Sequence, residues 1–147
     1  MITERFNLRV YGLLVHQGRV LVADELVGGH RITKFPGGGL ELGEGTKDCL
    51  VREVREELGL EATDVVHFYT TDFFQPSAYR AGDQIISIYY TFQVAAPGAI
   101  PVSTEPFAFK QQVHDEESFR WLDLATAKAG DVTLPIDRVV LGLLLGR

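Results

Sequence analysis

The sequence predicts an α/β fold in which helices cover a mixed β-sheet. Two observations favour this class. Strand-like runs rich in β-branched and aromatic residues outnumber the two segments that have helical character. The expected order is strand, strand, helix, three strands, helix, which does not alternate as a strictly parallel α/β fold does. We therefore expect a mixed sheet with few helices.

Composition limits the domain count and the class of partner. The 147 residues are 46% hydrophobic and 10% aromatic, which fits a single globular domain over residues 1–147. A formal net charge of −6 argues against a nucleic-acid partner, because phosphate binding normally requires a clustered basic face. Any nucleotide that the protein binds should therefore be a small molecule.

Several features predict a soluble protein of the cytoplasm. Cys49 is the only cysteine, so no internal disulfide forms, which suits a reducing compartment. The N-terminal segment has no apolar core of a signal peptide. The apolar C-terminal run is far shorter than the roughly 20 residues that span a bilayer, so we expect no membrane partner.

The first half of the chain contains two strands, a loop and a helix. Residues 7–24 form two strand-like runs around a turn at Gln17-Gly18. Residues 24–34 are polar and are expected to form a loop that leads into the glycine-rich stretch 35–45. A helix is predicted from about residue 47 to 58, with Thr46 as its N-cap and Gly59 as its stop.

The second half contains three strands and a final helix. Strands are expected at residues 65–74, 84–94 and 119–124. Residues 95–106 carry three of the six prolines and predict a loop. Residues 123–129 favour a helical turn, and Pro135 is placed to begin a helix that continues to Leu145.

The helix at 47–58 has two distinct faces on a helical wheel. One arc of roughly 100° is apolar and should pack on the sheet, whereas a neighbouring arc of roughly 100° is acidic. The apolar residues are Leu50, Val51, Val54 and Leu58, and the acidic residues are Glu53, Glu56 and Glu57.

The acidic arc conflicts with the local rules of helix stability. Glu53 repels Glu57 at i,i+4 and Glu56 at i,i+3, and each such pair costs a few tenths of a kcal/mol. Glu56 and Glu57 also lie in the last turn, where the helix dipole disfavours anions. A solvated face with ion pairs is the ordinary alternative. Converging carboxylates instead predict a hard divalent cation, with Mg²⁺ first, and a backbone carbonyl of Gly37-Gly38-Gly39 is a candidate further ligand.

Residues 38–60 resemble the Nudix box, G-x5-E-x7-R-E-U-x-E-E-x-G-U, where U is a bulky aliphatic residue. Val54 and Leu60 fill the aliphatic positions, and the seven fixed positions are filled by Gly38, Glu44, Arg52, Glu53, Glu56, Glu57 and Gly59. The resemblance to this MutT-like hydrolase family implies an α/β/α sandwich with a mixed β-sheet and a catalytic loop-helix-loop. It also implies hydrolysis of a nucleoside diphosphate linked to another moiety, by attack of water on phosphorus assisted by Mg²⁺ or Mn²⁺.

The resemblance also implies roles for individual residues. The three glutamates of the acidic arc should ligate the metal together with the carbonyl of Gly37. Arg52 should orient a box glutamate, and Glu44 should support the loop and helix. The general base differs between members of the family; residues 114–118 offer several carboxylates, of which we favour Glu116. A polar loop without catalytic function is the alternative for this segment.

The substrate is the least determined property. Pro76 lies 16 residues beyond Leu60, as in ADP-ribose pyrophosphatases of the family, which favours ADP-ribose or a nucleotide sugar. A (d)NTP pyrophosphatase of the nucleotide-sanitising type and a non-catalytic nucleotide-sensing domain remain alternatives. A prenyl diphosphate isomerase is disfavoured, since Cys49 within the box does not supply the cysteine pattern which that chemistry requires.

Other side chains are candidate contacts for a nucleotide. Phe73, Phe74 and Tyr79 are candidates for stacking on a base, although core packing is the ordinary role of such residues. Cations in loops are candidates for pairing with phosphates, with a solvated surface role as the alternative; these are Arg31, Lys34 and Arg80.

The C-terminal segment 135–146 is apolar on nearly every side, so it should be buried in its own core or against a second copy in a homodimer.

Overall fold

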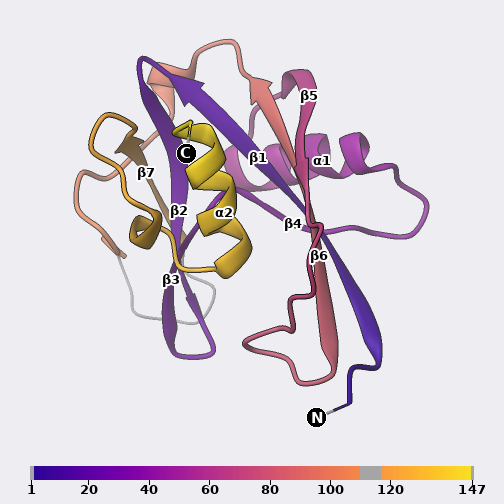
Figure 1. Ribbon diagram of the computed structural model, residues 1–147. Helices are drawn as coiled ribbons and strands as arrows, with labels where there is room; N and C mark the ends of the chain where they lie inside the picture. Colours follow the sequence, from indigo (N-terminus) through magenta and orange to yellow (C-terminus); the bar gives the residue numbers. More distant parts are fainter. Residues whose placement is uncertain (1, 110–116, 147) are drawn as a thin grey trace. The chain divides into compact units, whose positions relative to one another are not determined.

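The computed structural model describes residues 2–109 and 117–146 (Figure 1). The chain divides into two compact units. The first unit comprises residues 1–13 and 37–95, and the second comprises residues 14–36 and 96–147. Strand β1 (Arg5–His16) contributes its first part to one unit and its end to the other. The single domain over residues 1–147 stays a prediction.

The first unit contains β1, β4 (Gly37–Gly39), α1 (Thr46–Leu58), β5 (Thr63–Thr70) and β6 (Asp83–Gln93). Strands β4 and β5 pair antiparallel with β1 and β6, respectively, and β6 is the neighbour of β1. Helix α1 contacts both β4 and β6. The sheet therefore provides the surface on which the glutamate-bearing helix rests.

Gly12 explains how closely α1 approaches the sheet. A Cβ atom at this position would lie 2.8 Å from the Leu50 side chain and 2.5 Å from the Phe92 ring. Both side chains are fully or almost fully buried, as is Val54 one turn further along α1. The absence of a side chain at Gly12 thus lets the apolar face of the helix pack directly against β6.

The second unit contains the end of β1, β2 (Arg19–Val27), β3 (His30–Lys34), β7 (Glu117–Asp123) and α2 (Pro135–Leu144). Two 3₁₀ turns complete it, η1 (Pro97–Ala99) and η2 (Ala129–Asp131). Strand β2 pairs antiparallel with β1, β3 and β7. It is therefore the central strand of this unit.

Residues 24–34 were wrongly predicted to form a loop. Strand β2 continues to Val27, and β3 returns from His30 after a two-residue turn at Gly28-Gly29, whose φ angles are +54° and +81°. Two adjacent residues with positive φ make the turn that matches the twist of a hairpin. Leu26 and Ile32 are buried, so the polar composition concealed an ordinary strand pair.

Most other predicted elements agree in type and differ at their ends, but strand β4 was not predicted, and the predicted loop 95–106 contains η1. Thr46 was wrongly predicted as the N-cap of α1. The Gln17-Gly18 turn is confirmed, with φ angles of +51° and +73°. Strand β5 ends at Thr70, four residues earlier than expected. Helix α1 begins at Thr46 after an N-cap at Gly45, because Thr46 directs its hydroxyl to Tyr90 while Asp48 accepts the Gly45 N–H at 2.9 Å. Gly59 ends the helix as predicted, with a φ of +68°.

Helix α2 is less completely buried than its composition suggests. Ile136, Val140 and Leu141 are buried, whereas Val139 and Leu143 are 40% and 44% exposed. Neither helix that the structure describes has the length and apolar character needed to cross a bilayer.

Candidate active site

Arg52 connects helix α1 to the loop before it and to strand β4. Its Nε donates to Glu44 Oε2 at 3.0 Å and its Nη2 donates to Glu44 Oε1 at 2.8 Å, which is a bidentate pair. The same Nη2 donates to the carbonyl of Gly39 at 2.9 Å. Glu44 therefore holds the guanidinium in place and ties the loop of the box to the helix.

The remaining guanidinium nitrogen of Arg52 lies between two of the predicted metal ligands. Nη1 is 3.1 Å from Glu53 Oε1 and 3.2 Å from Glu56 Oε2, and a third carboxylate, that of Glu41, is 3.6 Å away. This positive charge reduces the repulsion between the glutamates of the acidic arc. The structure thus brings Glu53 and Glu56 to one point.

Gly37 and Gly38 of β4 leave room for the glutamate side chains of α1. A Cβ atom at Gly38 would lie 2.4 Å from Glu53 Oε1, and one at Gly37 would lie 2.1 Å from the carbonyl oxygen of Val10. Gly37 also has a φ of +148° and donates its N–H to Glu57 Oε2 at 3.2 Å. Glycine is therefore required at position 37, whereas at position 38 a side chain would displace the Glu53 carboxylate from its place.

The pKa values of Glu44 and Arg52 show that these two supporting residues form a strong ion pair. The hydrogen bonds from Arg52 and from the Glu41 backbone lower the pKa of Glu44 from 4.5 to about 2. The pKa of Arg52 is raised, chiefly by its hydrogen bond to Glu44. Glu44 therefore stays ionised throughout the physiological range and acts as the counter-ion of Arg52.

The pKa of Cys49 is shifted upward, whereas that of Glu44 is shifted downward. Burial, and then its hydrogen bond with Glu44, raise the pKa of the thiol to about 12. Its Sγ lies 3.5 Å from the carbonyl oxygen of Gly39, against the base of the box loop. A thiol so rarely deprotonated is a poor nucleophile.

The arrangement fits a hard divalent cation. Among residues 2–109 and 117–146, no three His, Cys, Asp or Glu side chains are already gathered as a complete metal-binding group. Yet Glu53 and Glu56 converge on one nitrogen, Glu57 is held at β4, and Gly37-Gly38 leave a cradle that side chains would fill. An oxygen-only donor set of this kind suits Mg²⁺ or Mn²⁺. Ligation by the Gly37 carbonyl stays a prediction.

The remaining sequence candidates differ in burial. Glu116 falls outside the described residues. In the first unit, Phe73, Phe74 and Tyr79 are 40%, 60% and 44% exposed, so the core alternative is wrong for them. In the second unit, Lys34 is buried beside Glu25, with Nζ 3.4 Å from Oε2, so it is not a solvated surface charge.

Arg31 and Arg80 both have partners in the structure. The Arg31 guanidinium lies 5.5 Å from the centre of the Phe107 ring, and Arg80 Nε lies 3.8 Å from Asp83 Oδ2. Pro76 forms a bridge with Gln84 at the beginning of β6. Contact of these three residues with a substrate stays a prediction.

A second arginine–carboxylate cluster was missed by sequence analysis. Asp24, on β2, is fully buried and accepts hydrogen bonds from Arg120 Nε at 2.8 Å, Arg120 Nη2 at 3.2 Å and Thr33 Oγ1 at 2.6 Å. It also accepts the backbone N–H of Phe107 at 3.0 Å. No local signal in the sequence could have found this pair, because Asp24 and Arg120 are 96 positions apart.

Comparison with known proteins identifies the family of the chain. A family model described as the NUDIX domain matches residues 5–141. The chain belongs to the NUDIX family. It is accordingly a Nudix hydrolase, an enzyme class that acts on phosphorus anhydrides and is generally dependent on divalent metals. A search of curated protein sequences returns no significant match.

Solved structures agree with the Nudix fold. A MutT NUDIX hydrolase from Burkholderia pseudomallei aligns with a TM-score of 0.71 at 18% identity, over 94% of this chain and 97% of that one. A NUDIX hydrolase from Nitrosomonas europaea aligns with a TM-score of 0.66 at 21% identity, over 92% and 85%. The E. coli ORF135 protein aligns with a TM-score of 0.64 at 22% identity, over 97% and 91%. The predicted family and the Nudix-type α/β/α fold with a mixed sheet are confirmed.

Proposed function

We propose that this Nudix hydrolase is a Mg²⁺- or Mn²⁺-dependent pyrophosphohydrolase that cleaves a diphosphate bond in a nucleoside diphosphate linked to another moiety. The observation that carries the proposal is the convergence of Glu53 and Glu56 on a single Arg52 nitrogen, at 3.1 and 3.2 Å, next to a glycine cradle. One guanidinium cannot neutralise Glu44, Glu53 and Glu56 together. The surplus negative charge favours a divalent cation.

Each residue of the cluster has a distinct task in this proposal. Glu53, Glu56 and Glu57 hold the metal, with the carbonyl of Gly37 as a further ligand, and Arg52 keeps the carboxylates in position. When bound, the metal supplies charge neutralisation for the phosphates and lowers the pKa of a coordinated water. We assign the general base to Glu116, whose carboxylate would accept the proton of the attacking water.

For the substrate we favour ADP-ribose or a nucleotide sugar. The Pro76 loop carries the exposed rings of Phe73, Phe74 and Tyr79, and exposed aromatic faces can stack on a base. A (d)NTP pyrophosphatase is the second candidate, because the Burkholderia neighbour is named a MutT hydrolase and aligns over 97% of its length. The site chemistry on α1 serves both substrates equally.

Product analysis tests the proposal. Purified protein with Mg²⁺ is incubated with ADP-ribose, nucleotide sugars, dinucleoside polyphosphates and canonical or oxidised NTPs, and the products are separated by chromatography. A nucleoside monophosphate and a sugar phosphate would support the favoured substrate. A monophosphate and pyrophosphate from an NTP would support the second candidate, and no turnover of any compound by folded protein would contradict the proposed function.

We further propose that the enzyme acts in the cytoplasm on small nucleotides and forms a homodimer. The observation that favours a dimer is the exposure of two apolar side chains on α2, Val139 at 40% and Leu143 at 44%. Covering such side chains by a second copy would remove apolar area from water. Light scattering that gives the monomer mass across a concentration series would contradict the dimer.

A further inference from the structure

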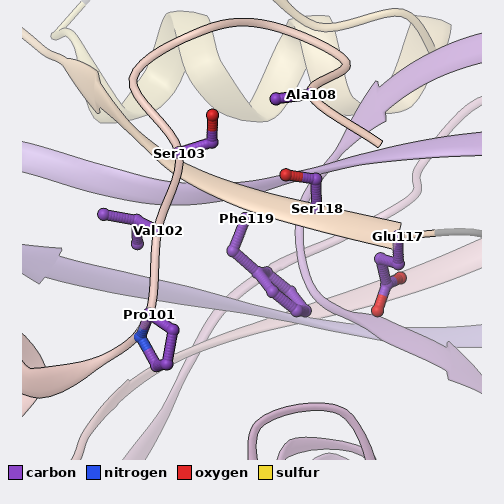
Figure 2. A pocket seen from close by; sticks show the side chains of 7 residues that line it. All are labelled: Pro101, Val102, Ser103, Ala108, Glu117, Ser118 and Phe119. Atoms are coloured by element: carbon purple, nitrogen blue, oxygen red, sulfur yellow. The ribbon is translucent and has the colours of Figure 1, made fainter. Parts of the chain in front are cut away.

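The diphosphate of the proposed substrate and the box glutamates together carry more negative charge than one divalent cation neutralises. Arginine or lysine side chains commonly hold phosphoryl groups in such sites. Arg52 is already bound by the carboxylates of Glu44, Glu53 and Glu56. The groove of about 450 Å³ between residues 101–108 and β7 (Figure 2) has Glu117 as the only ionisable side chain among the described residues that line it. Neither place therefore supplies surplus positive charge for phosphates.

Arg9 on β1 lies beside the glycine strand β4. In the antiparallel register of the two strands it is opposite Gly39, and its Nη1 lies 3.4 Å from where a Cβ atom of Gly39 would stand. A Cβ atom at Gly38 would lie 2.4 Å from Glu53 Oε1. Successive positions of a strand face opposite sides, so Arg9 and Glu53 border β4 on its two faces. Because β4 consists of glycines, only its backbone separates the guanidinium from the Glu53 carboxylate.

Tyr11 fixes the position of the Arg9 side chain. The two residues are i and i+2 on β1 and share one face of the strand. Arg9 Nε donates to the Tyr11 hydroxyl at 3.1 Å, and the guanidinium carbon lies 5.8 Å from the centre of the ring. The Tyr11 ring is only 4% exposed and packs against the fully buried Tyr89, with 5.5 Å between the ring centres. The arginine is therefore held by a side chain that the core immobilises.

The other arginines of the first unit make a different kind of contact. Each has a carboxylate within 4 Å: Arg5, Arg52, Arg55 and Arg80. An aromatic ring attracts a guanidinium without neutralising it, so the contact with Tyr11 leaves the positive charge of Arg9 in place. Arg9 is also partly exposed, and its Nη1 lies beside a residue that has no side chain to cover it. A positioned, partly exposed guanidinium has the features of a phosphate-binding residue.

We propose that Arg9 binds the diphosphate of the substrate, with its terminal nitrogens donating to non-bridging phosphoryl oxygens. Tyr11 is the positioning residue that orients the guanidinium for this contact. The inference rests on the proposed function, because it names a residue outside the box that determines the binding of the same substrate.

Calorimetric titration with methylenediphosphonate, whose P–C–P bridge is not hydrolysed, tests the contact at a fixed Mg²⁺ concentration. Arg9→Gln should bind this probe about 10–100-fold more weakly than wild type, because charge-assisted hydrogen bonds are lost. Tyr11→Phe keeps the ring and removes the hydroxyl that holds Arg9, so it should weaken binding about 3–10-fold. The matched control is Arg55→Gln, which removes the same charge from the exposed pair with Glu61 and should bind as wild type does.

Equal affinity of wild type and Arg9→Gln, or no binding of the probe by wild type at millimolar concentration, would overturn the proposal. If Arg9→Gln does not fold, Arg9→Lys takes its place. Lysine keeps the charge without the fork, so this variant should bind the probe at least about 3-fold more weakly.

Steady-state kinetics on the substrate that product analysis identifies give a second readout. KM should rise in Arg9→Gln and in Tyr11→Phe by about the factors by which probe affinity falls, with a smaller change in kcat. A purely structural role of Tyr11 would not change KM in this way. Unchanged kcat/KM in an Arg9 variant that has lost probe affinity would overturn the proposal, because Arg9 would then bind an anion outside the reaction.

These outcomes are distinct from a failure of the proposed function. Hydrolysis of a nucleotide by wild type and by Arg9→Gln with equal kcat/KM would overturn the role of Arg9 and leave the proposed function standing. Binding of the probe that depends on Arg9, by wild-type protein that hydrolyses nothing, would contradict the proposed function and leave the phosphate contact standing.

Discussion

Both units of the molecule contain an arginine that binds carboxylates, and the two clusters differ in charge balance and exposure. In the first unit, Arg52 lies within 3.2 Å of Glu44, Glu53 and Glu56, and the Glu56 side chain is 58% exposed. In the second unit, Arg120 pairs at 2.8 Å with Asp24, whose side chain is 1% exposed. The first cluster has surplus negative charge, whereas the second is neutral.

The difference separates a functional cluster from a structural one. A buried, balanced pair with every acceptor used holds strands together and leaves nothing for a ligand. A partly exposed cluster with more carboxylates than cations is poorly stable by itself, and a divalent cation can complete it. Substitutions in the two clusters should therefore affect different properties: the free energy of unfolding in one, and turnover in the other.

The largest effect is expected from Asp24→Asn. This change leaves the mostly buried Arg120 without its counter-charge, and breaking a buried pair costs about 3–5 kcal/mol of unfolding free energy. Urea denaturation measures the loss. The exposed Asp64→Asn is the control and should stay within about 0.5 kcal/mol of wild type. Equal stability of the two variants would contradict a structural role for the Asp24 cluster.

Glu57→Gln, unlike Asp24→Asn, should lower turnover and leave the free energy of unfolding nearly unchanged. Loss of a metal ligand removes several kcal/mol of transition-state stabilisation, so kcat should fall by about 10²–10³-fold. The free energy of unfolding should change by less than about 1 kcal/mol, because the side chain acts on the ligand and not on the core. Steady-state kinetics and urea denaturation measure both quantities, with the exposed Glu61→Gln as control. Full turnover in folded Glu57→Gln would exclude its role as a ligand.

Arg52→Lys should have an intermediate effect. Lysine keeps the charge but not the fork that holds Glu44 through two nitrogens, at 3.0 and 2.8 Å. Loss of such a supporting contact typically lowers activity by about 10–100-fold. Arg55→Lys, which alters a bidentate pair with Glu61 on the same helix, is the matched control and should stay near wild-type kcat/KM because that pair is exposed. Similar kinetics for the two variants would show that Arg52 acts through its charge alone.

The smallest effect concerns the pH dependence of stability. The folded-state pKa of Glu44 is about 2, below its ordinary value of 4.5. Its contribution to stability is therefore present above about pH 4.5 and is lost as the pH falls toward 2. The difference in unfolding free energy between wild type and Glu44→Gln should shrink over this window in urea titrations. A difference that does not vary with pH would show that Arg52 does not perturb Glu44.

Sequence reasoning located the elements whose signals are local. The spacing of the box identified α1, its apolar face and its glutamates, because all of these follow from the helical period within residues 46–59. The hairpin at Gly28-Gly29 was missed because its polar side chains concealed the strand alternation.

Contacts between distant residues were beyond the sequence. Asp24 and Arg120 are 96 positions apart, and the register of β2 and β7 brings them together. The need for glycine at position 37 arises from the backbone of Val10 on β1, whose carbonyl oxygen would lie 2.1 Å from a Cβ atom. Phe107, with a φ of +54°, donates its N–H to Asp24, which is 83 positions away. Such features appear only when strand pairing and helix packing are known.

The central claim is that the carboxylates of α1 form a divalent-cation site. A titration with Mn²⁺, followed by the electron paramagnetic resonance signal of the free ion, tests it most directly on wild type, Glu56→Gln, Glu57→Gln and the Glu61→Gln control. Wild type and Glu61→Gln should bind Mn²⁺ alike, and both box variants should bind it at least about 10-fold more weakly. Equal affinity in all four proteins would show that these carboxylates do not ligate the cation.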